Sequence, residues 1–252
     1  MLSTKRQSDI LRRVRQQGSC SVVDLASHLA VTTETVRRNL KSLVDAGALT
    51  KFHGGVMLPE TVAEPVFQRR MKINQKAKQL IAKLAVSRIK NGDTVFLDNG
   101  TTTTYVAEAL AARSALTIVT NAAEIACRVA RQNGNRVFMA GGELNADDIA
   151  AFGSGTLDFI RQFQVRYALI SIGGINERGE LLDFHLFEAD VARAAMQQAA
   201  ETWVIADKSK FGRNAPVRVC GLDAVQVVIT DAIPPPEFLS LLAEAKVALV
   251  TP

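Results

Sequence analysis

The stretch FLDNGTTTTYVAEAL, residues 96–110, contains a hydroxyl-rich turn between an apolar run and a helical pattern. The apolar run ends at Asp98, Gly100 permits a sharp turn, and apolar residues then recur at helical spacing through Val106 and Leu110. A strand, a turn and a helix in this order bring free backbone N–H groups, threonine hydroxyls and the positive end of a helix to one place. These groups suit a phosphate, which either an enzyme or a sensor could hold.

Polar residues also follow other strand-like runs in the C-terminal part of the chain. The runs TVFLD, LTIVT, RVFMA, YALISIG, TWVIA, VQVVIT and VALV are separated mostly by helical stretches, which predicts an α/β fold with a parallel sheet wrapped by helices. Ligands of such sheets bind beyond the carboxyl ends of the strands. The candidate ligand-binding residues near these ends are Asp98, Gly100, Thr101, Thr102, Thr120, Asn121, Gly141, Gly142, Gly173, Asp183, Glu188, Asp207 and Lys210.

The residue types at these strand ends favour a phosphorylated ligand that also carries hydroxyl groups. Threonine hydroxyls, the Lys210 ammonium and a helix N-terminus can bind the phosphate. Asp98, Asn121 and either Asp183 or Glu188 can accept hydrogen bonds from sugar hydroxyls. We therefore expect these motifs to converge on one crevice.

The positive charge of the chain is concentrated at its N-terminus. Residues 1–56 contain nine Lys or Arg and four Asp or Glu, whereas residues 57–252 contain 21 of each. The formal net charge of +5 therefore belongs to the first segment. A basic head on a neutral body is typical of a nucleic-acid-binding domain joined to a second domain, although a chance fluctuation in a short segment would look the same.

Three amphipathic helices are expected in the N-terminal segment. They cover TKRQSDILRRVRQQG, SVVDLASHLA and TTETVRRNLKSLVDAG, and a tight turn at Ala30 and Val31 makes the last two a helix-turn-helix. On the third helix Val36 and Leu40 share an apolar face, while Arg38 points the other way. The polar face can enter a DNA major groove.

A short two-stranded wing is expected after the third helix. ALTKFHGGVMLP contains an apolar stretch, a glycine pair and a returning run, with its tip near His53 and Gly54. Thr32 can cap the third helix, and arginine can pair with guanine or with phosphate. The candidate DNA-contacting residues are Thr33, Thr35, Arg37, Arg38, Lys41, Lys51 and His53.

The sequence of this N-terminal segment resembles that of a known protein family. VTTETVRRNLKSLVDAGALTKFHGG is similar to the winged helix-turn-helix of DeoR-type bacterial transcriptional repressors, whose pattern is roughly V-S-x-x-T-[IV]-R-R-D-L, followed by L, G and H-G-G. Thr32 replaces the usual serine, and Asn39 replaces the usual aspartate. The second replacement removes a negative charge and could change how the two arginines are oriented.

The resemblance extends over nearly the whole chain. DNGTTTTYVAEAL, IVTNAAEIA, AGGEL and ADKSKFGR resemble the effector domain of the same family, which is related in fold to sugar-phosphate isomerases and to glucosamine-6-phosphate deaminase. The resemblance implies a repressor of a carbohydrate or polyol catabolic operon that is released by a phosphorylated sugar or polyol. Pro59 and Pro65 predict a linker at 58–73 between a DNA-binding domain, 1–57, and an effector-binding and oligomerisation domain, 74–252.

A sugar-phosphate isomerase-like enzyme with an accessory DNA-binding head is the alternative. An isomerising enzyme needs a positioned acid and base. The deaminase has an acid just before and a histidine just after the second glycine of one loop, where the similar GGINERGELL offers Arg178 and Glu180. This difference favours a sensor that is not an enzyme. A third possibility is a DNA-binding module whose second domain serves only for assembly.

Other classes of protein fit the sequence less well. No run approaches the roughly 20 uninterrupted apolar residues of a membrane helix, and the N-terminus lacks the apolar core of a signal peptide, so we expect a cytoplasmic protein without a membrane partner. Cys20, Cys127 and Cys220 are far apart and histidines are few, which suggests no disulfide frame, metal site or cofactor. Because one small head buries too little surface to select an operator in double-stranded DNA, we expect a homo-oligomer, either a dimer or a tetramer.

Overall fold

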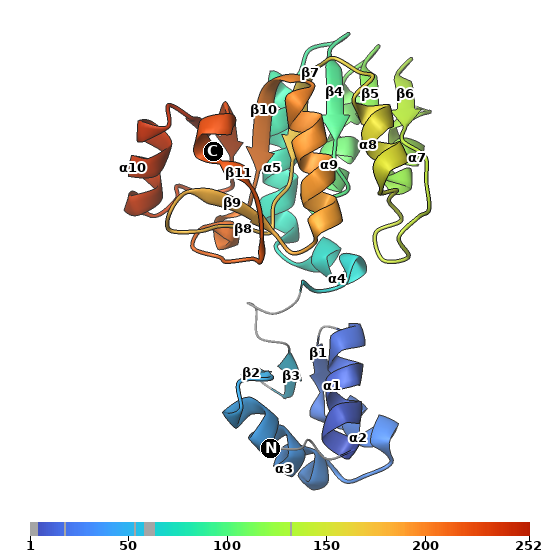
Figure 1. Ribbon diagram of the computed structural model, residues 1–252, viewed down its shortest axis with the longest axis vertical. Helices are drawn as coiled ribbons and strands as arrows, with labels where there is room; N and C mark the ends of the chain where they lie inside the picture. The colour runs from blue at the N-terminus through green and yellow to red at the C-terminus, as the bar shows by residue number, and fades with distance from the viewer. Residues whose placement is uncertain (1–4, 18, 53, 58–63, 132) are drawn as a thin grey trace. The chain divides into compact units, whose positions relative to one another are not determined.

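The chain forms two compact units, Met1–Val66 and Phe67–Pro252, which are described separately (Figure 1). The computed structural model describes residues 5–17, 19–52, 54–57, 64–131 and 133–252. Within these ranges, no helix has both the length and the apolar character that crossing a membrane requires.

The first unit is a winged helix-turn-helix. Its elements are α1 (Lys5–Gln17), β1 (Ser19–Ser21), α2 (Val22–Leu29), α3 (Thr33–Asp45), β2 (Thr50–Phe52) and β3 (Gly55–Met57). The strands form an antiparallel sheet in the order β1-β3-β2. The three helices and the wing are confirmed, but β1 is a further strand that the sequence did not predict, because so short a segment shows no clear alternation.

Apolar residues at helical spacing form the core of the first unit. Ile10 and Val14 on α1, Leu25 on α2, and Val36 and Leu40 on α3 are buried in one cluster. Each pair on one helix is four residues apart, so the two side chains lie on the same face. This packing leaves the opposite face of α3 to solvent.

The second unit alternates strands and helices as predicted. Its helices are α4 (Phe67–Lys72), α5 (Gln75–Arg88), α6 (Thr101–Ala109), α7 (Ala123–Val129), α8 (Ser154–Ile160), α9 (Leu186–Gln197) and α10 (Pro236–Glu244), with the short 3-10 helices η1 (Leu110–Ala112), η2 (Lys208–Lys210) and η3 (Leu222–Ala224). Its strands are β4 (Thr94–Leu97), β5 (Thr117–Thr120), β6 (Arg136–Met139), β7 (Val165–Ile170), β8 (Gly174–Ile175), β9 (Glu180–Asp183), β10 (Ala199–Ile205), β11 (Val217–Gly221), β12 (Val227–Ile229) and β13 (Ala248–Val250).

The main sheet is parallel and contains strands in the order β13-β12-β10-β7-β4-β5-β6. β4 pairs with β5 on one side and with β7 on the other, where Val95 lies opposite Ile118 and Tyr167. From β4 the chain continues to β5 and β6 in one direction, and then from β7 to β13 in the other. The strand order therefore reverses between β4 and β7, and open α/β sheets bind ligands beyond the carboxyl ends at such a reversal.

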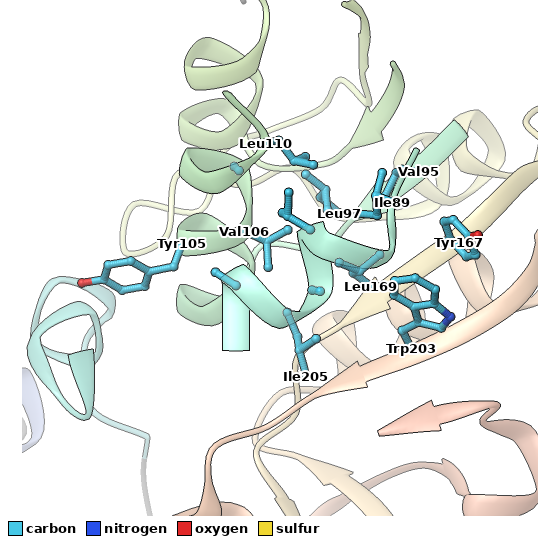
Figure 2. Close-up of a cluster of buried hydrophobic side chains, with 14 of the residues drawn as sticks. Ile89, Val95, Leu97, Tyr105, Val106, Leu110, Tyr167, Leu169, Trp203 and Ile205 are labelled. Atoms are coloured by element: carbon cyan, nitrogen blue, oxygen red, sulfur yellow. The ribbon is translucent and has the colours of Figure 1, made fainter. Parts of the chain in front are cut away.

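Helices cover both faces of this sheet, with α8 and α9 in front and α5 behind in Figure 1. Val95 and Leu97 of β4 join the buried cluster on the α5 side, whereas Phe96 joins the cluster on the α9 side. Figure 2 shows the first cluster, in which the rings of Tyr167 and Trp203 have centroids 4.1 Å apart. Packing on both faces fixes β4 and hence the turn that follows it.

Three parts of the second unit differ from the sequence expectation. β8, β9 and β11 form a separate antiparallel sheet, and α8 lies after β6. α4 lies within the range 58–73 that the sequence assigned to a linker. Phe67 at its start is buried, and its N–H donates to both carboxylate oxygens of Asp147 at 2.9 and 3.1 Å. This end of the expected linker therefore belongs to the second unit.

Candidate functional site

In the first unit, a tight turn and a side-chain cap position α3. Ala30 has a left-handed backbone, φ 51°, and its N–H donates to carbonyls in the last turn of α2. The side-chain oxygen of Thr32 then accepts a hydrogen bond from the N–H of Thr35 at 3.3 Å. The predicted cap is confirmed, and it fixes where the helix begins.

The exposed face of α3 carries the predicted cations. Arg37, Arg38 and Lys41 are exposed, whereas Val36 and Leu40 on the same helix are buried. Arg37 also forms an exposed ion pair with an acidic residue one turn earlier, 3.7 Å away, and such a pair contributes little to stability. This face can enter a major groove, where arginine pairs with guanine or with phosphate.

The remaining DNA-contact candidates lie around this face. Thr33 and Thr35 are half-buried in the first turn of α3, and Lys51 is exposed on β2. His53 lies outside the described residues. The side-chain amide of Asn39 donates to the carbonyl of Thr35 at 2.8 Å. Asn39 therefore bonds to its own helix, and no negative charge at this position orients the arginines.

In the second unit, the residues from Asp98 to Thr104 form what we call the threonine turn, at the carboxyl end of β4. Gly100 caps α6 by position, and the four threonines of its first turn are buried. The first N–H groups of a helix have no acceptor within it, and the helix dipole makes this end positive. The threonine turn can therefore attract an anion at the point where the strand order reverses.

Asp98 ties the threonine turn to the loop after β7. Its Oδ1 accepts from the N–H of Gly100 at 2.9 Å and from the hydroxyl of Thr103. Its Oδ2 accepts from the N–H and the hydroxyl of Ser171 at 2.6 and 2.9 Å. Burial raises the pKa of Asp98, and these hydrogen bonds oppose the rise. Because both oxygens are occupied, we infer that Asp98 positions the turn and does not contact the ligand directly.

Gly100 is required by the close approach of these two loops. Its φ of −73° suits any residue, but a Cβ there would lie 1.7 Å from the Oγ of Ser171. The sequence predicted a glycine that permits a turn. In the structure, glycine is required at position 100 for a steric reason, since no side chain fits there.

The threonine hydroxyls differ in what they contact. Those of Thr103 and Thr104 donate within the turn, and that of Thr101 accepts from Lys78 at 2.8 Å. Among the described residues, the Thr102 hydroxyl has no hydrogen-bond partner, although Thr102 is only 5% exposed. It can therefore both donate to and accept from a ligand without breaking an existing contact.

Lys78 in α5 is a further candidate site residue, which the sequence analysis did not identify. It is only 4% exposed, and its Nζ donates to Thr101 and to the carbonyl of Arg70. Lysine is almost never fully buried unless its charge is compensated, so its position beside the threonine turn is informative. The available signal was its helical spacing from Ile81 and Ala85, which lie on the buried face of α5.

Asn99 carries a second buried network next to the threonine turn. Its side-chain amide donates to Asp148 at 2.7 Å and to Glu188 at 3.2 Å. Burial raises the pKa of Asp148, and the nearby charge of Arg70 opposes this rise. The sequence predicted Glu188 but missed Asn99 and Asp148. Asp148 lies 49 residues further along the chain, in a loop without a recognisable motif.

Two further candidate ligand-binding residues, Thr120 and Asn121, lie at the carboxyl end of β5. The hydroxyl of Thr120 accepts from the N–H of Ala122 at 3.1 Å, so it serves the turn. Asn121 is completely buried, and its side-chain amide donates to the carbonyl of Ala151 at 3.0 Å. In the described part of the chain, its Oδ1 has no hydrogen-bond partner. A buried acceptor without a hydrogen bond lowers the stability of the fold unless a water or a ligand supplies a donor.

Asp207 and Lys210 follow β10. One carboxylate oxygen of Asp207 accepts from the side-chain amide of Asn74 at 3.0 Å and from the N–H of Ser209 at 3.0 Å. Asn74 precedes α5, so Asp207 ties the end of β10 to the helix that carries Lys78. Lys210 is half-buried at the end of η2 and has contacts of its own.

Four other candidates have contacts that serve turns and packing. Gly141 and Gly142 follow the edge strand β6, two strands from β4, and a side chain of α8 donates to the Gly141 carbonyl at 3.0 Å. A Cβ at Gly173 would lie 3.0 Å from the ring of Phe184. Asp183 accepts from the N–H of Phe184 at 2.7 Å. A role of these residues in ligand binding rests on the sequence prediction alone.

The loop compared above with the deaminase carries an ion-pair cluster. Glu180 accepts hydrogen bonds from Asn176 at 2.8 Å and from Arg178 at 2.7 Å, and Arg218 lies 3.2 Å away. The bonds from Asn176 and Arg178 lower the pKa of Glu180. A carboxyl group held ionised in this way is a poor general acid.

Comparison with known proteins assigns both units to one family. Residues 6–62 match the DeoR-like helix-turn-helix domain, and residues 73–232 match the DeoR C terminal sensor domain. The glycerol-3-phosphate regulon repressor of Escherichia coli (strain K12) is 36% identical, over 99% of this chain and 99% of its own. The HTH-type transcriptional repressor CsqR of the same strain is 29% identical, over 98% of this chain and 95% of its own.

Solved structures are more distant. Ribose 5-phosphate isomerase A from Methanocaldococcus jannaschii shares 16% identity and a TM-score of 0.41 over 55% of each chain. The family matches, by contrast, cover both units and include full-length repressors. The chain belongs to the DeoR family, as a DNA-binding transcriptional repressor with a sensor domain, and is not an enzyme.

Proposed function

We propose that this protein represses a carbohydrate or polyol catabolic operon and leaves the operator when a phosphorylated sugar or polyol binds to its second unit. The threonine turn is the observation that carries the proposal. One turn at the reversal of strand order brings together buried Lys78, the N-terminus of α6 and the hydroxyl of Thr102, which has no hydrogen-bond partner among the described residues. A phosphate there would meet a charge, a hydroxyl and backbone N–H groups.

Neighbouring groups suit the hydroxylated part of such a ligand. The Oδ1 of Asn121 is a buried acceptor without a partner among the described residues, so a ligand hydroxyl would satisfy it. The carboxylates of Asp148 and Glu188 lie beside Asn99 and can accept further hydrogen bonds. Lys210 would bring a second positive charge from the end of β10.

A ligand screen tests this function. The whole protein is heated with a panel of phosphorylated sugars and polyols, starting with glycerol 3-phosphate because the E. coli relative is named for it. An effector at a hundred times its Kd should add about 2.7 kcal/mol to the free energy of unfolding and raise the melting temperature. The same compound should release operator DNA in a gel shift. If the panel gives no thermal shift and no release, the second unit serves assembly only.

Thr102→Val tests the phosphate site. Valine keeps the shape of threonine but removes the hydroxyl, so we expect the Kd for the effector to rise about tenfold, by the loss of one hydrogen bond to a charged group. Operator binding without effector should not change. Thr202→Val is the matched control, because Thr202 is buried in the middle of β10. Equal calorimetric affinities in Thr102→Val and the parent would remove Thr102 from the site.

Arg38→Ala tests the recognition helix. Removing a base or phosphate contact should weaken operator binding by about 1–3 kcal/mol in a gel-shift titration. A base contact would show as lost sequence preference, and a phosphate contact as a smaller salt slope. The matched control is Arg161→Ala, since Arg161 is an exposed arginine of the second unit. Unchanged operator affinity would move the contact to Arg37 or Lys41.

We further propose that the protein acts in the cytoplasm as a homo-oligomer, either a dimer or a tetramer. One winged head buries too little surface to select a site among the many competing sites of a genome. Two heads would read paired half-sites, as other dimeric helix-turn-helix proteins do. Sedimentation of the whole protein should therefore show no monomer at working concentration.

A further inference from the structure

The short helix α4 is the first element of the second unit, directly after the segment that joins it to the DNA-binding unit. Two side chains hold its ends. Asp147 accepts from the N–H of Phe67 with both carboxylate oxygens, at 2.9 and 3.1 Å. The hydroxyl of Tyr105 donates to the carbonyl of Met71 at 3.0 Å. In Figure 2 the ring of Tyr105 extends away from the other labelled side chains of its cluster.

The residues that make these contacts with α4 lie next to the effector site proposed above. Tyr105 directly follows the threonine turn on α6. Asp147 precedes Asp148, which accepts from Asn99 in the second network. Lys78 donates both to the threonine turn and to a carbonyl of α4. A change at the effector site can therefore reach α4 through directly bonded groups.

The loop that carries Asp147 contains a strained residue. Ile149 has a φ of 51°, which is rarely adopted by a β-branched side chain. Its N–H donates to the carbonyl of Asn145, and its carbonyl accepts from Ala123, both at 3.0 Å. Such a backbone costs about 1–3 kcal/mol and persists only where the surroundings impose it. The loop is thus suited to a second arrangement when its neighbours change.

We propose that Asp147 and Tyr105 are positioning residues that hold α4 in the operator-binding arrangement and thereby couple effector binding to operator release. The inference rests on the proposed function. An effector phosphate at the threonine turn competes with the carbonyl of Arg70 for the N–H donors of Lys78. Ligand hydroxyls at Asp148 act on the loop that carries Asp147. Both changes weaken the contacts that hold α4. The point at which the chain enters the second unit is then less firmly fixed.

The direction in which a substitution changes the apparent affinity for the effector distinguishes a positioning residue from a residue that contacts the effector and from one that only stabilises the fold. A ligand shifts an equilibrium only by its different affinities for the two arrangements. Weakening the hold on α4 raises the released fraction, and the apparent affinity for the effector rises with that fraction. A residue that contacts the effector would lower this affinity when replaced. A residue that only stabilises the fold would lower the melting temperature without making release easier.

Asp147→Ala and Tyr105→Phe each remove one holding contact. Each variant should release operator DNA at about two- to tenfold lower effector concentration than the parent, which corresponds to the net free energy of one hydrogen bond. The probe is glycerol 3-phosphate, or the compound of the panel that releases the parent. Asp158→Ala is the control, because Asp158 is exposed on α8 in a pair with Arg161. A half-release concentration that is unchanged or higher in both variants would overturn the proposal.

The variant that carries both substitutions gives a test without effector. Its released fraction should be large enough to weaken operator binding at least about threefold, although neither residue belongs to the DNA-binding unit. Circular dichroism and the melting temperature establish whether the double variant is folded. If it is not folded, the operator affinity of Tyr105→Phe alone decides the test. Operator affinity equal to that of the parent would refute the coupling role. This result does not depend on which compound, if any, the screen identifies.

Discussion

Gly100→Ala should destabilise the second unit by about 3 kcal/mol, at the upper end of what overpacking costs, and should abolish the effector response. Alanine accepts the backbone of position 100, where φ is −73°, so the effect is steric. The added Cβ would lie 1.7 Å from the Oγ and 2.5 Å from the Cβ of Ser171. The loops after β4 and β7 must then separate, and Asp98 can no longer bond to both. Denaturant unfolding, followed by circular dichroism, measures the change.

A second substitution should rescue this variant. Ser171→Gly removes the two nearest atoms that the new Cβ would meet and leaves the Oδ1 of Asp98, at 3.1 Å. Alone it costs about 1 kcal/mol through the lost hydrogen bond to Asp98. The double variant should therefore be more stable than the sum of the two effects predicts, by about 1–2 kcal/mol. Gly155→Ala is the control, because nothing lies within 4 Å of a Cβ at that position and Gly155 is not a candidate for ligand binding. A Gly100→Ala protein that unfolds like the parent would show that the two loops separate at no cost.

The main sheet was predictable because its strands are short apolar runs bounded by turn residues. Runs such as TVFL and TIVT are buried on both faces by helices, so their hydrophobicity is almost continuous and easily recognised. The same reasoning fails for β8, which contains only Gly174 and Ile175. It also fails for α4, whose FQRRMK pattern is mostly polar and whose position depends on Asp147, far along the chain.

The places of the candidate site residues in the fold were predictable where suitable side chains and strand ends coincide in sequence. Asp98 and the threonines follow β4 directly, so their place beyond the sheet follows from the fold class. The contacts of Lys78 and Asp148 could not be predicted, because each joins the turn from a separate segment through tertiary packing. The positioning role that we infer for Asp98 also needs the structure, since only the structure shows that Ser171 and the turn occupy both of its oxygens.

Lys78→Met is the second large effect that we expect. Methionine keeps much of the side-chain length but removes the ammonium that donates to Thr101 and to the carbonyl of Arg70. A buried charged partner of a phosphate contributes about 1.5–3 kcal/mol, so the Kd for the effector should rise about ten- to a hundredfold. Calorimetric titration measures this Kd directly, and gel shifts measure the effector concentration that releases the operator. Lys76→Met is the matched control, because Lys76 is exposed on the same helix.

Lys78→Met has two opposing effects on operator release. Their relative sizes decide whether the variant needs more or less effector than the parent. Losing the bond from the Lys78 ammonium to the Arg70 carbonyl loosens α4 and should favour release by the amount of one hydrogen bond between a charged donor and a neutral acceptor, about tenfold. Losing the ammonium beside the phosphate acts in the other direction and is the larger effect, since both of those partners are charged, whereas the Arg70 carbonyl is neutral. The variant should therefore need more effector than the parent, whereas Tyr105→Phe should need less. If Lys78→Met releases DNA at lower effector concentration, the ammonium serves only to hold α4, and the phosphate must bind elsewhere, with Lys210 as the next candidate.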